Sequence, residues 1–294
     1  MSWWQDTFHL AMVEAVLVGA LAGLIGVHVV LRRLSFFTMA LTHATFPGVV
    51  AASIIGVNLY LGGALAGAVA AVGVAALSRR SGQNAAAATG VVVSGGFALG
   101  VGLVATQNGF SRDLSSFLVG SILTVSVADV VTAAVVLVVV LGIVVVLGRQ
   151  LTFVGFDPVG ATAAGHRVGL LDLVLLLTIE VVIVAVVPAV GTILALALIV
   201  APAAAARLFS DRITVITALA MTFGITSGVG GLLVSRHFDV AAGASITLTA
   251  TAILLLSLTG RGWRAPRRQR PAPPSHQRGT RPAGGVTDTV AHGG

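Results

Sequence analysis

Long apolar runs dominate this chain and constrain its fold more than any other feature. A helix needs about 20 mostly apolar residues to cross a bilayer, and nine runs come close to or exceed this length, at residues 10–31, 36–56, 59–78, 86–106, 127–148, 170–188, 190–207, 213–235 and 243–260. Only 9% of the 294 residues are charged, against roughly 25% in soluble domains. We therefore predict an all-α, polytopic membrane protein with about nine transmembrane helices, and we exclude a soluble globular enzyme.

The arginines predict how these helices are oriented. Short cytoplasmic loops of membrane proteins carry an excess of basic residues. Here the odd-numbered runs are followed by arginines, and only Arg112 and Arg236 follow even-numbered runs. This alternation predicts a multi-pass protein of the plasma membrane, with its N-terminus outside and its C-terminus in the cytoplasm.

The composition changes sharply after residue 260. Residues 1–260 form the predicted transmembrane domain, whereas residues 261–294 are rich in proline, glycine and arginine. Such a segment cannot bury enough apolar surface to fold. We expect it to be a disordered cytoplasmic tail that lies against anionic headgroups rather than a segment that binds nucleic acid.

Two residue types are absent from the chain. It has no cysteine, which excludes disulfides and thiolate metal sites, and all 17 basic residues are arginine. Without lysine, no phosphate-binding loop ending in Gly-Lys-Ser/Thr can exist. Any ATP that drives this protein must therefore be hydrolysed by another subunit. The chain also lacks paired catalytic aspartates and an HExxH helix, so we expect no enzyme activity of its own.

Four acidic or histidine side chains lie within the apolar runs away from their end residues: Glu14, His28, His43 and Glu180, whereas Asp129 and Asp172 sit at predicted ends. Placing such a group in hydrocarbon costs at least roughly 2.5 to 3.5 kcal/mol, so each is a candidate functional residue. For His28 we expect a packing or interfacial role. Glu180 either carries a proton or cation or pairs with a buried arginine or serine, and the sequence leaves this open.

His43 lies in the segment LTHATFPGVV, where Met39 is on the same helical face and Pro47 follows one turn later. Proline lacks an amide hydrogen, so Pro47 cannot bond to the His43 carbonyl. A free carbonyl beside an imidazole is a candidate corner for binding a cation. The alternative is that His43 only forms a hydrogen bond to another helix.

The loop GFDPVGATAAGHRVG predicts a short helix outside the membrane. Asp157 is suited to the N-cap, Pro158 to the first helical position, and Gly165 to the left-handed residue that ends a helix. A two-turn helix of about seven residues with a small alanine face, including Ala161, would fit a groove in a partner protein.

Four segments, in order, resemble the zinc/manganese/iron group of ABC transporter permeases. LSFFTMALTHATFPGVV is similar to the family signature FxGDALSHAxLPG, and LSSFLVGSIL, FDPVGATAAGHRVGLLDL and VGTILALALIVAPAAAARLFSDR match further segments. The resemblance covers residues 10 to 260 and implies the fold of cobalamin- and metal-type ABC importer permeases. It identifies residues 158–164 with the family's coupling helix for the ATPase, together with the flanking His166.

The resemblance implies a permease that imports a divalent metal ion, zinc or manganese, with no tightly bound cofactor. It also implies cytoplasmic ATPase subunits, an extracytoplasmic metal-binding protein, and pairing with an identical or paralogous permease. Two alternatives remain open: a permease for a chelated metal or siderophore, and a proton-coupled secondary transporter that uses Glu14 and Glu180.

The chain departs from the family pattern at one position. Where the family has an aspartate four residues before the histidine, this chain has Met39. A thioether removes a negative charge and would favour Cu(I) over Mn²⁺ if it binds at all, so Met39 is either packing or a softer ligand. His43 would then take oxygen ligands from nearby threonines (Thr38, Thr42 and Thr45).

Asp239 also matches a family segment. The resemblance assigns it, with His237, to the outer mouth of the pathway. The alternative is that Asp239 is an N-cap of the last span.

Overall fold

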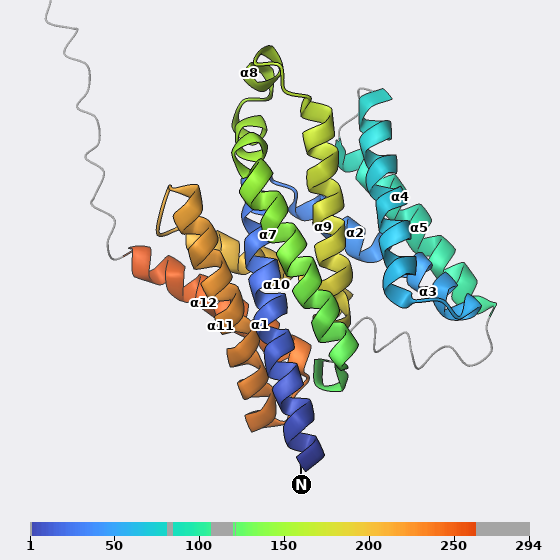
Figure 1. The fold of residues 1–294 in the computed structure, drawn as a ribbon, viewed down its shortest axis with the longest axis vertical. Helices are drawn as coiled ribbons and strands as arrows, with labels where there is room; N and C mark the ends of the chain where they lie inside the picture. The colour runs from blue at the N-terminus through green and yellow to red at the C-terminus, as the bar shows by residue number, and fades with distance from the viewer. Residues whose placement is uncertain (1, 81–84, 107–119, 121, 263–294) are drawn as a thin grey trace, which may run out of the picture.

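The computed structural model describes residues 2–80, 85–106, 120 and 122–262, and every regular element in these ranges is helical. This confirms the predicted all-α class (Figure 1). The helices are α1 (Ser2–Leu31), α2 (Ser35–Ala44), α3 (Phe46–Ile55), α4 (Leu59–Arg80), α5 (Ala85–Ala105), the 3-10 helix η1 (Ile122–Thr124), α7 (Val127–Phe156), α8 (Pro158–Ala163), α9 (Val168–Val190), α10 (Thr192–Arg207), α11 (Ile213–Phe238) and α12 (Ala242–Gly262).

Each of the nine predicted runs is helical. Within the described residues, seven helical segments are long and apolar enough to cross a membrane: α1, α2 with α3, α4, α7, α9, α11 and α12. The apolar parts of α5 and α10 are shorter. Helix α10 is short because Gly191, with φ of 93°, separates it from α9. The basic tail beyond residue 262 and most of the segment LSSFLVGSIL lie outside the described residues.

The second predicted span is interrupted at Thr45, which ends α2 and precedes α3. Pro47 lies at the start of α3 and has no amide hydrogen for the carbonyl one turn earlier. At the same point, the Thr45 hydroxyl donates to the carbonyls of Leu41, at 2.9 Å, and Thr42, at 3.0 Å. The span therefore bends two residues after His43.

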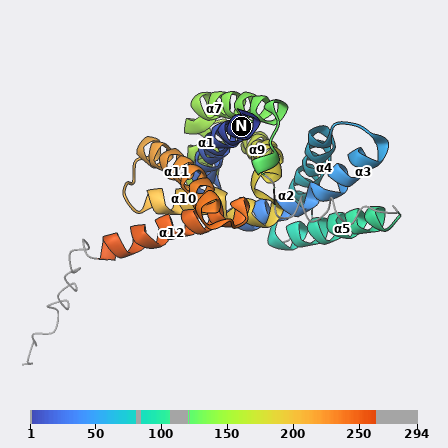
Figure 2. The ribbon, with the colours of Figure 1, turned by 90° about the horizontal axis from the view of Figure 1, so that it is seen from below.

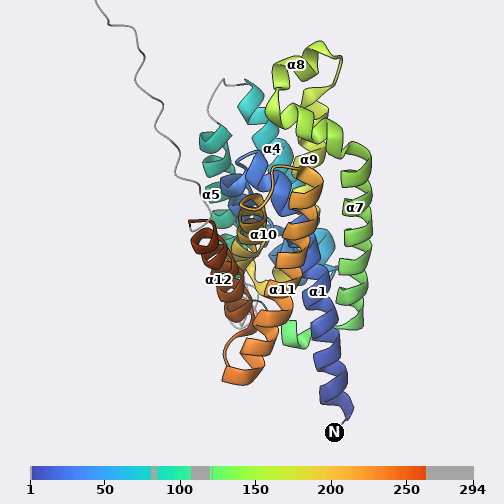
Figure 3. The ribbon, with the colours of Figure 1, turned by 90° about the vertical axis from the view of Figure 1, so that its left-hand side faces the viewer.

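Helix α1 lies in the centre of one half of the bundle and packs against α7, α9, α10 and α11. Its closest partner is α11 (Figures 1 and 3). A Cβ atom on Gly224 would overlap the carbonyl oxygen of Gly19, and one on Gly23 would overlap that of Ala220. Small residues thus bring the two backbones into direct contact, as in other membrane helix pairs.

Helices α3, α4 and α5 form a second group beside this one (Figure 2). They pack against one another, and α2 and α9 connect them to the rest of the bundle. Here too the contact is close, because a Cβ on Gly48 of α3 would overlap the carbonyl oxygen of Gly62 of α4. The bend at Thr45 lies where these two groups meet.

The N-terminus and α8 lie at opposite ends of the molecule (Figures 1 and 3). At the α8 end, Arg32 forms an ion pair with Asp172 of α9 and donates to the Leu151 carbonyl of α7 at 2.6 Å. Only 11% of the Arg32 side chain is exposed. This arginine fixes the relative positions of α1, α7 and α9 just before α8.

We predict that Gly224→Ala destabilises the fold, because its methyl group would collide with the α1 backbone. Overpacking of this kind costs about 1–3 kcal/mol. The measurement is the thermal unfolding midpoint of the detergent-solubilised protein. Gly142→Ala on α7 is the matched control, since nothing lies within 4 Å of its Cβ position. Equal midpoints for the two variants would contradict a tight contact between α1 and α11.

Candidate functional site

Helix α2 presents two different faces. Thr38, Thr42 and Thr45 are buried, and the Thr42 hydroxyl donates to the Met39 carbonyl at 2.7 Å. Met39 is 40% exposed and His43 is half-buried. The threonine hydroxyls therefore bond to the backbone inside the bundle, while Met39 and His43 lie at its surface.

An aromatic neighbour from α5 holds the His43 ring. The Phe97 ring meets it edge to face, with 5.8 Å between the centroids, and Phe97 in turn packs against Phe46 of α3. This contact orients the imidazole, and no hydrogen bond joins its nitrogens to another described residue. The nitrogens of His43 thus remain available to a ligand at the surface of α2.

His237 and Asp239 lie at the C-terminal end of α11 and are exposed. Asp239 is the C-cap of α11, with φ of 52°. The alternative prediction, an N-cap of the last span, is wrong, because α12 begins only at Ala242. The left-handed turn at Asp239 ends α11 and separates this carboxylate from the start of α12.

Asp239 lines a cavity of about 760 Å³ together with His9 of α1 and Arg236. Arg236 lies over the Phe8 ring, 4.4 Å from its centroid. This cavity is at the end of the bundle that carries the N-terminus, whereas α2 packs mainly against α5, α9 and α10. The structure therefore does not bring Asp239 and His43 together. Among the described residues, no three His, Asp or Glu side chains gather to hold a metal ion.

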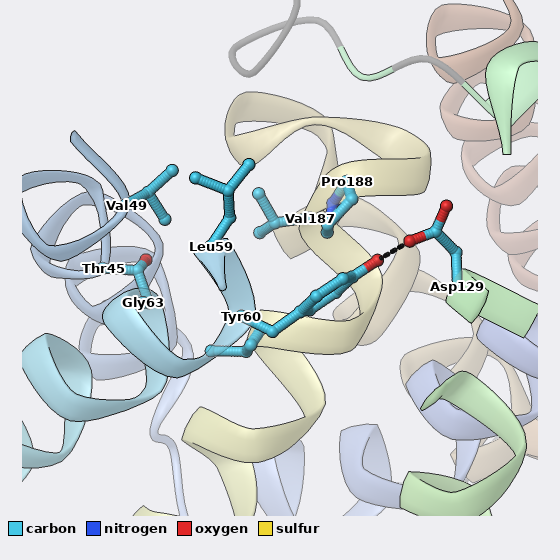
Figure 4. Close-up of a pocket in the computed structure, with 9 residues that line it drawn as sticks. Thr45, Val49, Leu59, Tyr60, Gly63, Asp129, Val187 and Pro188 are labelled. Carbon is cyan, nitrogen blue, oxygen red and sulfur yellow. Dashed lines mark hydrogen bonds between the residues drawn. The ribbon is translucent and has the colours of Figure 1, made fainter. Parts of the chain in front are cut away.

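A smaller cavity, of about 180 Å³, lies where the bend after α2 meets α4, α7 and α9 (Figure 4). Its lining is mostly apolar, and its polar side chains are Thr45, Tyr60 and Asp129. The Tyr60 hydroxyl donates to the Asp129 carboxylate. The backbone N–H and the hydroxyl of Ser126 donate to the other oxygen of Asp129, at 2.9 and 2.7 Å. The Asp129 carboxylate thus caps α7 and links it to α4.

The pair formed by Tyr60 and Asp129 could not be predicted from the sequence. The two residues are 69 positions apart, and no spacing rule connects the start of one helix to the start of another. The local signal was limited to Ser126 and Asp129, whose spacing of three residues is typical of a capping box.

Glu180 is buried between α9 and α4, with 1% of its surface exposed. Neither carboxylate oxygen has a hydrogen-bond partner among the described residues. It occupies a notch at Gly67 of α4, where a Cβ atom would overlap the carboxylate. Pairing with an arginine or serine, one of the alternatives left open by the sequence, is therefore not seen. Glu14 of α1 is similarly buried, and one of its oxygens lacks a partner.

Helix α8 protrudes beyond the membrane helices (Figure 1). The Asp157 carboxylate accepts the Gly160 N–H at 2.7 Å, and Pro158 is the first residue of the helix. Gly165 is left-handed, with φ of 84°. The His166 N–H donates to the Ala161 carbonyl at 3.0 Å. The predicted capped helix is present, with six residues.

Ala161 does not lie on the exposed face of α8. It is fully buried, and 78% of Val159 is exposed instead. The His166 ring packs edge to face against Phe153 at the end of α7. The small side chain of Ala161 thus lets α8 sit closely on its own chain, and any partner would contact the opposite side.

Comparisons with known proteins agree on one family. The model of the ABC 3 transport family matches residues 5–261. The manganese transport system membrane protein MntC of Halalkalibacterium halodurans is 34% identical, over 84% of this chain and 85% of that protein. The manganese import system permease protein ScaB of Streptococcus gordonii is 33% identical, over 85% of this chain and 91% of that protein.

Solved structures show the same fold. PsaBC from Streptococcus pneumoniae, solved in complex with a Fab, superimposes with a TM-score of 0.79 and 33% identity, over 86% of this chain and 91% of that chain. An inward-facing structure described as a metal-chelate type ABC transporter gives a TM-score of 0.70 over 85% of both chains. Its 16% identity shows a shared fold only.

We predict that Glu180→Met stabilises the fold. The two carboxylate oxygens are buried without partners, and leaving such groups unsatisfied costs about 1–3 kcal/mol. Methionine has a similar length and fits the notch at Gly67 without polar atoms to satisfy. The thermal unfolding midpoint in detergent measures the effect.

Asp172→Asn is the comparison variant, because it removes the ion pair of Arg32 and should lower the midpoint. A lower midpoint for Glu180→Met as well would mean that the carboxylate has a stabilising partner in the folded protein.

Proposed function

The chain belongs to the ABC 3 transport family, and from this premise we propose that it is the membrane-spanning permease subunit of an ABC importer for a divalent metal ion. Manganese is the favoured cargo, because relatives that are 33–34% identical along most of their length carry the names of manganese transport permeases. The permease itself makes and breaks no bonds of its substrate.

Helix α8 is the observation that carries this proposal. It is capped by Asp157 and stands at one end of the bundle, where Arg32 ties α1, α7 and α9 together. A rigid helix held between α7 and α9 would transmit the movement of a docked ATPase subunit to both helices. The absence of lysine agrees with ATP hydrolysis on that separate subunit.

This assignment also orients the protein. With α8 in the cytoplasm, the N-terminal end of α1 and the cavity at His9 and Asp239 face the outside. An extracytoplasmic metal-binding protein would dock at that end. The cavity there holds one carboxylate and one guanidinium, from Asp239 and Arg236. We assign Asp239, with His237, to this outer mouth and not to the same site as His43.

The metal pathway is proposed to follow the exposed face of α2. His43 offers one nitrogen ligand there, and Met39, one turn away, is exposed on the same helix. Divalent metals take four or more ligands, and no group of three or more His, Asp or Glu side chains forms among the described residues. A second permease, identical or paralogous, would bring the remaining ligands, because this face is at the surface of one subunit.

The two alternative functions have weaker support. The likeness to a metal-chelate type transporter is one of fold alone, at 16% identity. Proton coupling through Glu14 and Glu180 would suit their burial, but membership of an ABC transport family favours transport driven by ATP. Reconstituted transport separates these functions from the proposed one.

We predict that His43→Ala lowers manganese uptake by about tenfold or more, since losing one ligand commonly costs at least 1.4 kcal/mol of binding, or a factor of ten. Uptake is measured in proteoliposomes that contain the permease, its ATPase and its metal-binding protein. Membrane insertion and the unfolding midpoint should be unchanged. Normal uptake by this variant would remove His43 from the pathway.

In the same assay, Met39→Asp should raise manganese uptake, because an oxygen ligand with a negative charge suits Mn²⁺ better than a thioether. Phe36→Asp is the matched control, as it adds the same charge to an exposed position of α2 one turn from Met39.

The same assay separates the alternative functions. Uptake that follows a proton gradient without the ATPase would contradict the ABC mechanism. ATPase stimulation only by a siderophore complex would contradict ion transport.

We predict that the double variant Asp157→Ala, Pro158→Ser weakens co-purification of the ATPase. Loss of the cap costs about 1 kcal/mol of helix stability, which is large for a helix of six residues. Ser126→Ala removes a comparable cap from the opposite end of α7 and serves as the control. An undiminished complex in the double variant would mean that the ATPase binds elsewhere.

A further inference from the structure

A groove runs along the outside of the bundle between α7 and α11, with α1 as its floor. Its cavity has a volume of about 780 Å³. The walls are formed by Leu141, Val144, Val145, Gly148, Arg149, Thr152, Phe153 and Phe156 of α7 and by Ile213, Thr214, Thr217, Ala218 and Met221 of α11. Leu24 and His28 of α1 lie at its base. Neither the proposed metal pathway nor the proposed ATPase contact uses this groove.

The groove opens on a face of the protein that meets lipid. Helix α7 lies at the edge of the bundle, on the side opposite α5 and α12 (Figure 2). Its outward residues are large and apolar, and Val138, Val145 and Val146 are each more than 70% exposed. In a bilayer, a groove on such a face is filled by lipid.

The polarity of the groove changes along its length. Helix α7 runs toward α8 and α11 runs away from it, so Arg149, Thr152 and Thr214 lie at the α8 end. Leu141, Val144 and Met221 line the part nearer the middle of the membrane. The guanidinium of Arg149 and the hydroxyls of Thr152 and Thr214 therefore lie at the α8 end, beside the Phe153 and Phe156 rings, whereas the part nearer the middle of the membrane is lined mainly by apolar side chains.

The charge at the polar end is unbalanced. Arg149 is exposed, and no hydrogen bond or ion pair joins it to another described residue. None of the groove-lining residues is an aspartate or glutamate. A guanidinium with several donors in a fixed plane matches a phosphate group well. The hydroxyls of Thr152 and Thr214 add further donors at the same end of the groove.

The dimensions fit one acyl chain. Leu141 lies eight residues before Arg149, which corresponds to about 12 Å along a helix. The hydrocarbon of one leaflet is about 15 Å thick, half of the 30 Å core. A headgroup at Arg149 would therefore place its acyl chain along the apolar part of the groove.

We propose that this groove binds an anionic phospholipid from the leaflet on the α8 side. Arg149 binds its phosphate group, Thr152 and Thr214 donate to the headgroup oxygens, and one acyl chain lies between α7 and α11 over Leu24. The lipid fills the space between two helices that have no extensive contact of their own. It thereby supports the end of α7 that leads into α8.

The test uses the full-length protein, purified in mild detergent and stripped of lipid. Phosphatidylglycerol and phosphatidylcholine with identical acyl chains are added in turn. Retained lipid is counted by native mass spectrometry, and the unfolding midpoint is measured in parallel. We expect phosphatidylglycerol to be retained at about tenfold lower concentration than phosphatidylcholine and to raise the midpoint by several degrees.

Two variants with matched controls locate the site. Arg149→Gln should abolish the preference for phosphatidylglycerol, whereas Arg207→Gln, an exposed arginine outside the groove, should leave it intact. Gly148→Leu should block binding of both lipids by filling the groove. Its Cβ meets only the Val144 side chain, at 3.7 Å, so the fold tolerates it. Gly142→Leu, on the same helix with nothing within 4 Å, is its control.

Several results would overturn the proposal. Equal retention of the two lipids by the unaltered protein would show that no headgroup is selected. An equal loss in the Arg149 and Arg207 variants would indicate general attraction to surface charge. Stabilisation by inorganic phosphate equal to that by phosphatidylglycerol would make the site an anion site. A dimer that Gly148→Leu dissociates would show that the groove holds a second copy of this chain.

Discussion

The direct backbone contact between α1 and α11 is the interaction on which the rest of the bundle depends. Lipid chains are as apolar as leucine, so helices in a membrane gain little from burying apolar side chains and associate through close packing. Gly19 and Gly23 of α1 meet Ala220 and Gly224 of α11 with no side chain between them. Because α1 also packs against α7, α9 and α10, this contact sets the positions of the helices that hold α8 and the groove.

Polar side chains fall into two groups according to where they lie. At the helix ends several of them bond across to other helices: Arg32 pairs with Asp172, and Asp129 bonds to Tyr60 and Ser126. These bonds join helices that the glycine contacts alone do not fix, α1 to α9 and α4 to α7. Glu180, in contrast, lies within a span without a partner. The missing side chain of Gly67 leaves space for the Glu180 carboxylate, but no positive charge lies beside it among the described residues.

The sequence predicted where the helices lie along the chain better than which side of each helix is buried. Apolar runs located the long helices of the described residues, and Asp157, Pro158 and Gly165 marked both ends of α8, whereas the run 36–56 was predicted as one span and is divided at Thr45. The rotation of each helix could not be predicted, because helices such as α7 are apolar on every side. Hence the burial of Ala161, the notch that Gly67 provides for Glu180, and the exposure of Met39 emerged only from the packing. The position of Asp239 as the C-cap of α11 could not be predicted either, because the left-handed turn there leaves no clear pattern in the sequence.

The two proposed binding surfaces lie on different sides of the bundle. Helix α7 has an open, lipid-facing side, whereas α2, α5 and α12 lie on the other side (Figure 2). A second permease that completes the ligand set of His43 would cover the α2 side and leave the groove between α7 and α11 in contact with lipid. Since α7 and α9 both lead into α8, movement of that helix reaches the groove through α7 and the packing of α2 through α9. A lipid bound at Arg149 would thus act through α7 on α8, the helix that we propose contacts the ATPase, without touching the proposed path of the ion.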